Sequence, residues 1–95
     1  MTIYLDRLRY SWKGRKWTHL IADEIDELHE FAQRIGVSRV FFEKNSKYPH
    51  YDIDMMQVQK ALVNGAVFLE KREFIKIAKN LSLSVVKKNQ IGLFD

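Results

Sequence analysis

Cysteine is absent from this 95-residue sequence, which also has one proline and four glycines. The lack of thiols excludes disulfide bonds, zinc sites built from thiolates and catalysis by a cysteine nucleophile. It is also typical of proteins in a reducing compartment, so we expect a cytoplasmic protein, in the host cytoplasm if a phage encodes it. No apolar run approaches the roughly 18 residues of a transmembrane helix, and no charged leader precedes an apolar stretch. We therefore expect neither a membrane partner nor a signal peptide.

Aromatic residues, by contrast, are plentiful. The chain has six Phe, four Tyr and two Trp, and 46% of its residues are hydrophobic. Such a composition is typical of a folded chain, and the length suits one domain with one modest core. We assign residues 1–86 to this single domain. Residues 87–95 are then an apolar and basic C-terminal tail.

The charges are separated along the chain. Five basic residues and no acid lie between Arg7 and Lys16, whereas five acids lie between Asp23 and Glu30. The net charge of +4 suits an anionic partner but is ordinary for a small domain. The position of the basic segment therefore says more about function than the total charge.

Hydrophobic spacing predicts three helices. Residues 25–35 carry one apolar stripe at helical spacing, begin after Asp23 as the expected N-cap, and end at Gly36. Asp52 or Asp54 caps a second predicted helix that ends at Gly65, and a third covers residues 71–81.

Short apolar runs predict the strands. These are residues 3–5, 37–42, 66–69 and 83–86, with residues 17–22 either a strand or an irregular segment. We expect residues 7–16 to form a basic loop, residues 43–49 a polar loop, and His50–Asp52 to lie outside regular structure. Strands that alternate with helices predict an α/β (or α+β) fold with a small, mostly parallel sheet of about three to five strands.

Eighteen residues occur in a distinctive order along the chain: Tyr4, Asp6, Trp17, His19, Leu20, Ala22, Asp23, Glu27, Leu28, His29, Phe31, Ala32, Arg34, Ile35, Gly36, His50, Tyr51 and Asp52. This order resembles that of a small bacterial and phage family, domain-of-unknown-function family 4031. The resemblance covers about residues 2–81 and implies the family's fold and a polar site, but no function. The family usually has two successive acids where this chain has Asp6 and Arg7. It often has Gly-Asp where this chain has Tyr48 and Pro49.

The same part of the chain holds the candidate ligand-binding residues. Guanidinium groups suit phosphate oxygens, and indole rings stack on bases. We predict non-enzymatic binding of a phosphorylated small molecule, such as a nucleotide or a nucleotide-derived signal. The predicted site residues are Asp6, Arg7, Arg9, Trp12, Arg15, Trp17, His19, His29, His50, Tyr51 and Asp52. The context of a family shared with phages implies a counter-defence role, in which the protein sequesters a signalling nucleotide.

Other interpretations stay open. A phosphoesterase or nuclease would use His19 or His50 as general base with Asp52, although no nucleophile motif accompanies them. A divalent metal would need three or four ligands from a set that includes Asp6 and Asp23, but no HExxH or His-x-His spacing is present, so no cofactor is predicted.

Two further expectations concern partners. A module that inhibits another protein is the third functional hypothesis, and long nucleic acid is disfavoured because the acidic helix would repel it. The short chain and its apolar tail predict a homo-oligomer.

Overall fold

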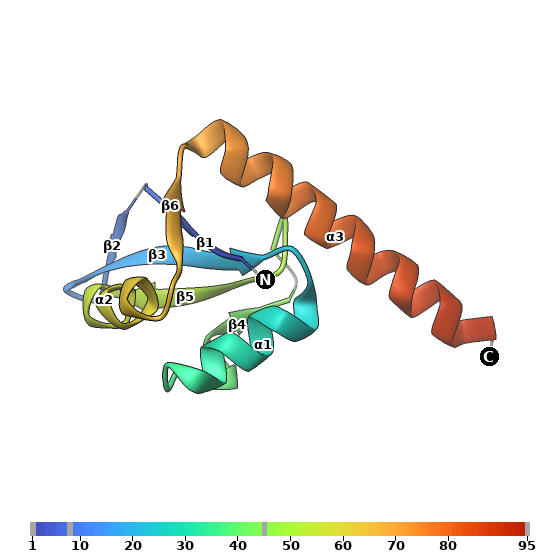
Figure 1. The fold of residues 1–95 in the computed structure, drawn as a ribbon, viewed down its shortest axis with the longest axis horizontal. Coiled ribbons are helices and arrows are strands. Elements are labelled where there is room, and N and C mark those ends of the chain that lie inside the picture. Colours follow the sequence, from blue (N-terminus) through green and yellow to red (C-terminus); the bar gives the residue numbers. More distant parts are fainter. Residues whose placement is uncertain (1, 8, 45, 95) are drawn as a thin grey trace.

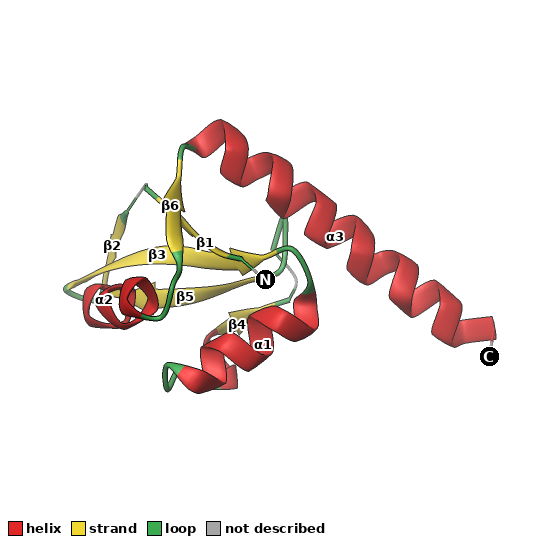
Figure 2. Cartoon of the chain, viewed as in Figure 1, coloured by secondary structure: helices red, strands yellow, loops and turns green. Residues whose placement is uncertain are grey.

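The fold is a mixed sheet covered by helices on both faces, shown by a computed structural model that describes residues 2–7, 9–44 and 46–94. Helices α1 and α2 lie on one side of the sheet and α3 lies on the other (Figures 1 and 2). The elements are β1 (Ile3–Asp6), β2 (Tyr10–Trp12), β3 (Arg15–Ala22), α1 (Ile25–Arg34), a 3₁₀ turn η1 (Arg39–Phe41), β4 (Phe42–Glu43), β5 (His50–Asp54), α2 (Met55–Val63), β6 (Val67–Leu69) and α3 (Lys71–Phe94). The prediction of one α+β domain with three helices is thus confirmed.

The sheet is mixed, so the prediction of a mostly parallel sheet of three to five strands was wrong. It has six strands in the order β4-β5-β3-β1-β6, with β2 paired to β3. Only β1 and β6 are parallel among the described pairs; the other four pairs are antiparallel. Strand β3 follows a hairpin turn, and a short connection of this kind makes neighbouring strands antiparallel.

The basic segment 7–16 contains this hairpin and is not the loop that we predicted. Strand β2 pairs with the start of β3, from Tyr10 opposite Trp17 to Trp12 opposite Arg15. Lys13 and Gly14 form the connection with φ angles of 51° and 76°. Two successive residues with positive φ are typical of a two-residue hairpin turn, and glycine adopts such angles without steric cost. The Lys-Gly pair was the signal for this turn.

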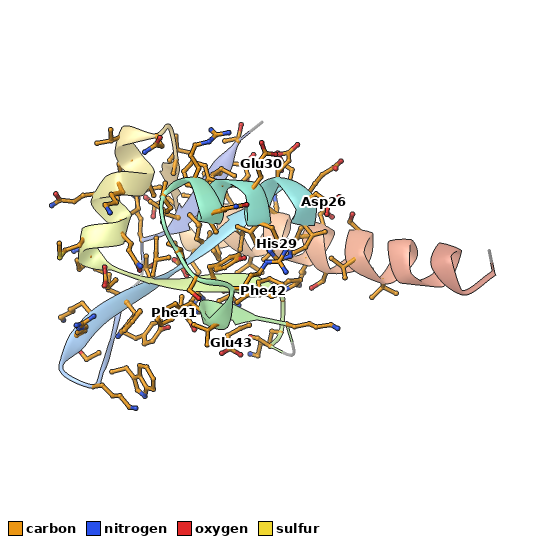
Figure 3. All side chains as sticks on the ribbon, turned by 90° about the horizontal axis from the view of Figure 1, so that it is seen from below. Asp26, His29, Glu30, Phe41, Phe42 and Glu43 are labelled. Carbon is orange, nitrogen blue, oxygen red and sulfur yellow. The ribbon has the colours of Figure 1, made fainter. Side chains whose placement is uncertain are left out.

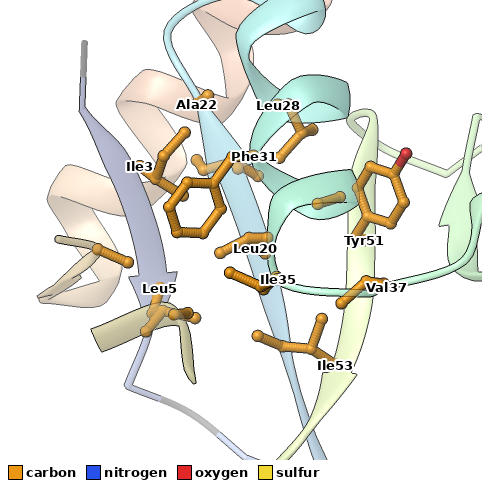
Figure 4. Packing of buried hydrophobic residues seen from close by; sticks show 14 of the residues in the cluster. Ile3, Leu5, Leu20, Ala22, Leu28, Phe31, Ile35, Val37, Tyr51 and Ile53 are labelled. Atoms are coloured by element: carbon orange, nitrogen blue, oxygen red, sulfur yellow. The ribbon is translucent and has the colours of Figure 1, made fainter. Parts of the chain in front are cut away.

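The main core lies between α1 and one face of the sheet. Alternate strand residues face it, among them Leu5, Leu20 and Ile53, each fully buried (Figure 4). From α1, Leu28 and Phe31 complete the packing. Because successive side chains of a strand point to opposite faces, the residues between them lie on the α3 side of the sheet. That alternation sends His19, His50 and Asp52 to one face.

Helix α1 confirms the predicted helix, but its N-cap is not Asp23. Glu24 is the N-cap residue and makes no side-chain capping hydrogen bond. Asp23 instead accepts a hydrogen bond from the Tyr4 hydroxyl at 3.1 Å. Gly36, with φ of 79°, ends the helix as predicted.

Helix α2 begins with a complete capping box. The Asp54 carboxylate accepts from the Gln57 backbone N–H at 2.9 Å, and the Gln57 side chain accepts from the Asp54 backbone N–H at 3.0 Å. We expect Asp54→Ala to lower the free energy of unfolding by about 1–2 kcal/mol, because the backbone N–H of Gln57 loses its side-chain acceptor. Urea denaturation measures this change. Asn is a good N-cap residue, so Asp54→Asn is the control, and an equal loss in both variants would show that the cap is not the cause.

Three further expectations were wrong. Residues 37–42 contain the turn η1, and only Phe42 of this run is in a strand. Residues 83–86 belong to α3, and His50–Asp52 belong to β5. Short apolar runs fit a buried strand or a helix segment equally well, so periodicity alone does not separate them.

The predicted tail at 87–95 begins inside α3, which continues to Phe94; Asp95 lies outside the described residues. The first half of α3 packs on the sheet and the second half projects away from it (Figure 1). Within the described part of the chain, no helix combines the length and the apolar character needed to cross a bilayer.

Candidate functional site

Two histidines and an aspartate meet on the α3 face of the sheet. His19 of β3 lies opposite Asp52 of β5 in the antiparallel register, and His50 is two residues before Asp52 on the same strand. The Nε2 atoms of His50 and His19 lie 3.2 and 3.4 Å from Asp52 Oδ1. The two imidazole ring centres are 4.0 Å apart. We refer to these three residues as the histidine cluster.

Tyr48 holds both imidazole rings of the histidine cluster. Its backbone carbonyl lies 2.9 Å from His50 Nδ1, and its hydroxyl oxygen lies 2.9 Å from His19 Nδ1. Its ring in turn packs edge-on against Phe74 of α3, with centroids 5.8 Å apart. The orientation of both histidines therefore depends on one residue in the segment before β5.

Tyr10 of the hairpin also contacts the cluster. Its hydroxyl donates to Asp52 Oδ1 at 2.7 Å, and its ring meets the edge of the His19 ring at 5.4 Å. Burial and the hydrogen bond to Asp52 raise the pKa of Tyr10. The hairpin thus brings Tyr10 into contact with Asp52, which lies 42 residues later in the sequence.

The cluster is arranged to keep Asp52 ionised and His19 neutral. Burial by itself would raise the pKa of Asp52, but hydrogen bonds from His50 and Tyr10 outweigh it and lower that pKa. Burial, followed by the nearby His50, lowers the pKa of His19. Burial, with Asp6 and Asp52 nearby, raises the pKa of Tyr48 to about 12. At neutral pH the site therefore combines a carboxylate, a neutral imidazole and two phenol groups.

A hollow of about 290 Å³ opens beside His19, between β1, the hairpin and the start of α3. Two of its lining side chains, Arg9 and Lys71, are cations, and we refer to the hollow as the cationic cleft. Its lining residues are Asp6, Arg9, Tyr10, His19, Tyr48, Lys71 and Ile75. Three of them were predicted as site residues, namely Asp6, Arg9 and His19.

A second hollow of about 450 Å³ is also lined by Tyr10 and is mainly apolar, and we refer to it as the aromatic hollow. Trp12 is 54% exposed at its wall, whereas Trp17 is only 5% exposed. The Trp17 indole N–H donates to the Trp12 backbone carbonyl at 3.1 Å, which ties it to the hairpin. The lining residues are Tyr10, Trp12, Trp17, Val40, Phe41, Glu43 and Asp52.

Other predicted site residues do not join this group. Arg7 pairs with Glu70 at 2.9 Å, and Arg15 pairs with Asp54 at 3.5 Å. His29 lies on the opposite face of the sheet, where its Nδ1 is 2.8 Å from the Tyr51 hydroxyl. Its ring meets the edge of Phe42 at 4.6 Å, and Figure 3 shows it between α1 and that residue. The three histidines therefore divide into a pair on one face and a single residue on the other.

The sequence did not predict Tyr48 or Lys71 as site residues. Tyr48 stands two residues before His50, and that spacing was the only available signal for it. Lys71 begins α3, but nothing in the sequence indicates that this helix starts beside β1. Both depend on the packing of α3 against the sheet.

The fold and the site define the class of this molecule: a small α+β domain with a histidine–aspartate cluster beside a cationic cleft. The profile of DUF4031, described as a protein of unknown function, matches residues 3–81, and the chain belongs to that family. The predicted resemblance is confirmed. No curated protein and no solved structure matches the chain.

Proposed function

We propose that the protein binds a nucleotide-like phosphorylated small molecule across Tyr10, with the phosphate in the cationic cleft and the base in the aromatic hollow. The observation that carries this proposal is a pair of hollows that share Tyr10 as a lining residue, one with two cationic side chains and the other with four aromatic rings. Their volumes, about 450 and 290 Å³, are near the lower end of the range for small-molecule sites.

The cationic cleft suits a single phosphate group. Arg9 provides a guanidinium fork, and Lys71 provides an ammonium group at the first residue of α3. The N-terminal end of a helix carries a partial positive charge, which favours an anion at this position. Asp6, buried in the same cleft, disfavours a chain of several phosphates. We therefore expect a monophosphate or a phosphodiester at this end of the ligand.

The aromatic hollow suits a planar ring. The exposed indole of Trp12 lies at 65° to that of Trp17, with ring centres 5.9 Å apart, so the two form a corner. A base that enters this corner can stack on one indole and meet the edge of the other. Buried Trp17 supports the wall, and Trp12 is the ring available for stacking.

A depletion experiment tests the proposal. Purified protein is incubated with mono-, di- and cyclic nucleotides and ADP-ribose derivatives, removed by filtration and denatured, and both fractions are analysed by chromatography. We expect one class of nucleotide to leave the filtrate and to return intact from the denatured protein. If no member of the panel is depleted or converted, the proposal is wrong and a protein-inhibiting module is the better hypothesis.

Trp12→Ala separates the two ends of the ligand. We expect about a 10-fold loss of affinity for the depleted nucleotide, because stacking of one base contributes about 1–3 kcal/mol. Affinity for the matching ribose phosphate, which lacks the base, should not change. Isothermal titration calorimetry with both compounds measures the difference. An equal loss for both compounds would place Trp12 outside the base-binding end.

A second candidate function is hydrolysis of the bound phosphoester, and the histidine cluster favours it. His19 lines the cationic cleft and lies within 3.4 Å of Asp52, so an imidazole–carboxylate pair adjoins the expected phosphate position. Such a pair is suited to general acid–base chemistry. A new product in the filtrate, lost in His50→Ala, would establish an enzyme; intact recovery would establish a binding protein.

A further inference from the structure

We infer that the histidine cluster is a binding site for a divalent transition-metal ion, most suitably Zn²⁺, held by His19 Nε2, His50 Nε2 and Asp52 Oδ1. This inference deepens the proposed function at the same site. One nitrogen from each histidine, with a carboxylate oxygen, all lie within 4.8 Å of one another. It is the one group of this kind among the residues that the structure describes.

The spacing of the two nitrogen–oxygen pairs matches a tetrahedral site. Zn–N and Zn–O bonds are about 2.0–2.2 Å long, so two ligand atoms at the tetrahedral angle lie about 3.3–3.6 Å apart. The two nitrogen–oxygen distances in the cluster are 3.2 and 3.4 Å, and the third pair, the two nitrogens, lies within 4.8 Å. Binding of an ion therefore requires rotation of the imidazole rings toward each other, and it does not require a change in the strand register.

The hydrogen bonds of His50 give a second, independent argument. Its Nδ1 faces the carbonyl oxygen of Tyr48, which only accepts, so Nδ1 carries a proton. The other ring nitrogen, Nε2, points at Asp52 Oδ1 from 3.2 Å. A histidine ligated through Nε2 with its other N–H bonded to a carbonyl is the usual arrangement in metal sites.

The surroundings favour a site with an open coordination position. The side chain of His50 is 4% exposed, whereas those of His19 and Asp52 are 27% and 24% exposed. Three protein ligands leave the fourth tetrahedral position to water or to a ligand oxygen from the cationic cleft. The two imidazoles favour Zn²⁺ or a related transition metal over Mg²⁺ and Ca²⁺, which prefer oxygen ligands.

Metal titration of the full chain tests this inference without any organic ligand. We expect one Zn²⁺ per chain by calorimetry, and Co²⁺ should give the visible absorption bands of a tetrahedral site. Asp52→Asn keeps the shape of the side chain but removes its negative charge. Loss of a residue that only hydrogen-bonds a metal ligand costs about 10–100-fold in metal affinity, so loss of a ligand itself should weaken binding by about 100-fold or more. Tyr48→Phe removes only the hydroxyl that holds His19, and we expect about a 10-fold loss.

His29→Asn is the matched control, because it removes a histidine from the other face of the sheet and should leave binding unchanged. Should Asp52→Asn fail to fold, nitrogen-15 NMR of the wild-type imidazoles replaces it, and Zn²⁺ should shift His19 and His50 but not His29. No Zn²⁺ binding below millimolar concentration, or equal loss in His29→Asn, would overturn the inference. The proposed nucleotide binding is measured separately, so either result can fail without the other.

Discussion

Replacing Arg9 and Lys71 together by alanine is expected to weaken binding of the depleted nucleotide by about 100-fold or more. Each side chain lines the cationic cleft, and a hydrogen bond between a charged group and its partner contributes about 1.5–3 kcal/mol. Loss of two such contacts corresponds to at least about two factors of ten in the dissociation constant. Calorimetry of wild type and variant with the same nucleotide measures the change.

A second pair of substitutions separates local contacts from total charge. Lys60 and Lys79 are exposed residues of α2 and α3 and do not line the cationic cleft. Lys60→Ala/Lys79→Ala also removes two positive charges, and so lowers the net charge by the same amount as the first pair. We expect less than a threefold change in affinity at physiological salt, where exposed charges are screened beyond about 8 Å. If the two double variants bind equally weakly, the cationic cleft is not the phosphate site.

Replacing Phe31 by alanine should lower the free energy of unfolding by about 3–5 kcal/mol, which is the range for deletion of a buried aromatic side chain. Phe31 is 1% exposed and fills the space between α1 and the sheet (Figure 4). A small domain has only about 5–15 kcal/mol in total, so this variant should unfold at much lower urea concentration. Urea denaturation followed by far-ultraviolet circular dichroism measures the shift.

The control for this prediction lies on the same helix. Gln33 of α1 is exposed, so Gln33→Ala should change the free energy of unfolding by no more than about 0.5 kcal/mol. A loss below about 1 kcal/mol for Phe31→Ala would mean that the α1 face of the sheet is not the main core, because removal of a phenyl ring from a well-packed core lowers the free energy of unfolding by more than this.

Local signals in the sequence predicted the helices well. The stripe from Ile25 to Ile35, the Asp54 cap and the stops at Gly36 and Gly65 all act within one or two turns of chain. Such signals depend on neighbours close in sequence, so a single chain displays them directly. The prediction of Asp23 as the N-cap was wrong because its carboxylate accepts a hydrogen bond from the hydroxyl of Tyr4, nineteen residues earlier in the sequence.

Part of the candidate site was predictable by residue type. His19, His50 and Asp52 were selected as polar groups that suit ligand or proton chemistry, and the structure brings them together. His29 was selected for the same reason, but the helical position that places Leu28 and Phe31 in the core also directs His29 to the Tyr51 hydroxyl. Residue type alone does not say which face of the sheet a side chain occupies.

The sequence by itself determined the class of domain, the family, two helices and the start of the third. The tertiary structure alone decided which strands pair, and so which polar residues become neighbours. The register that sets His19 opposite Asp52 and the hairpin that carries Tyr10 to the same carboxylate join residues 33 and 42 positions apart. Contacts at that separation form because packing of the whole sheet offsets the entropy of closing the chain, and no local pattern records that balance.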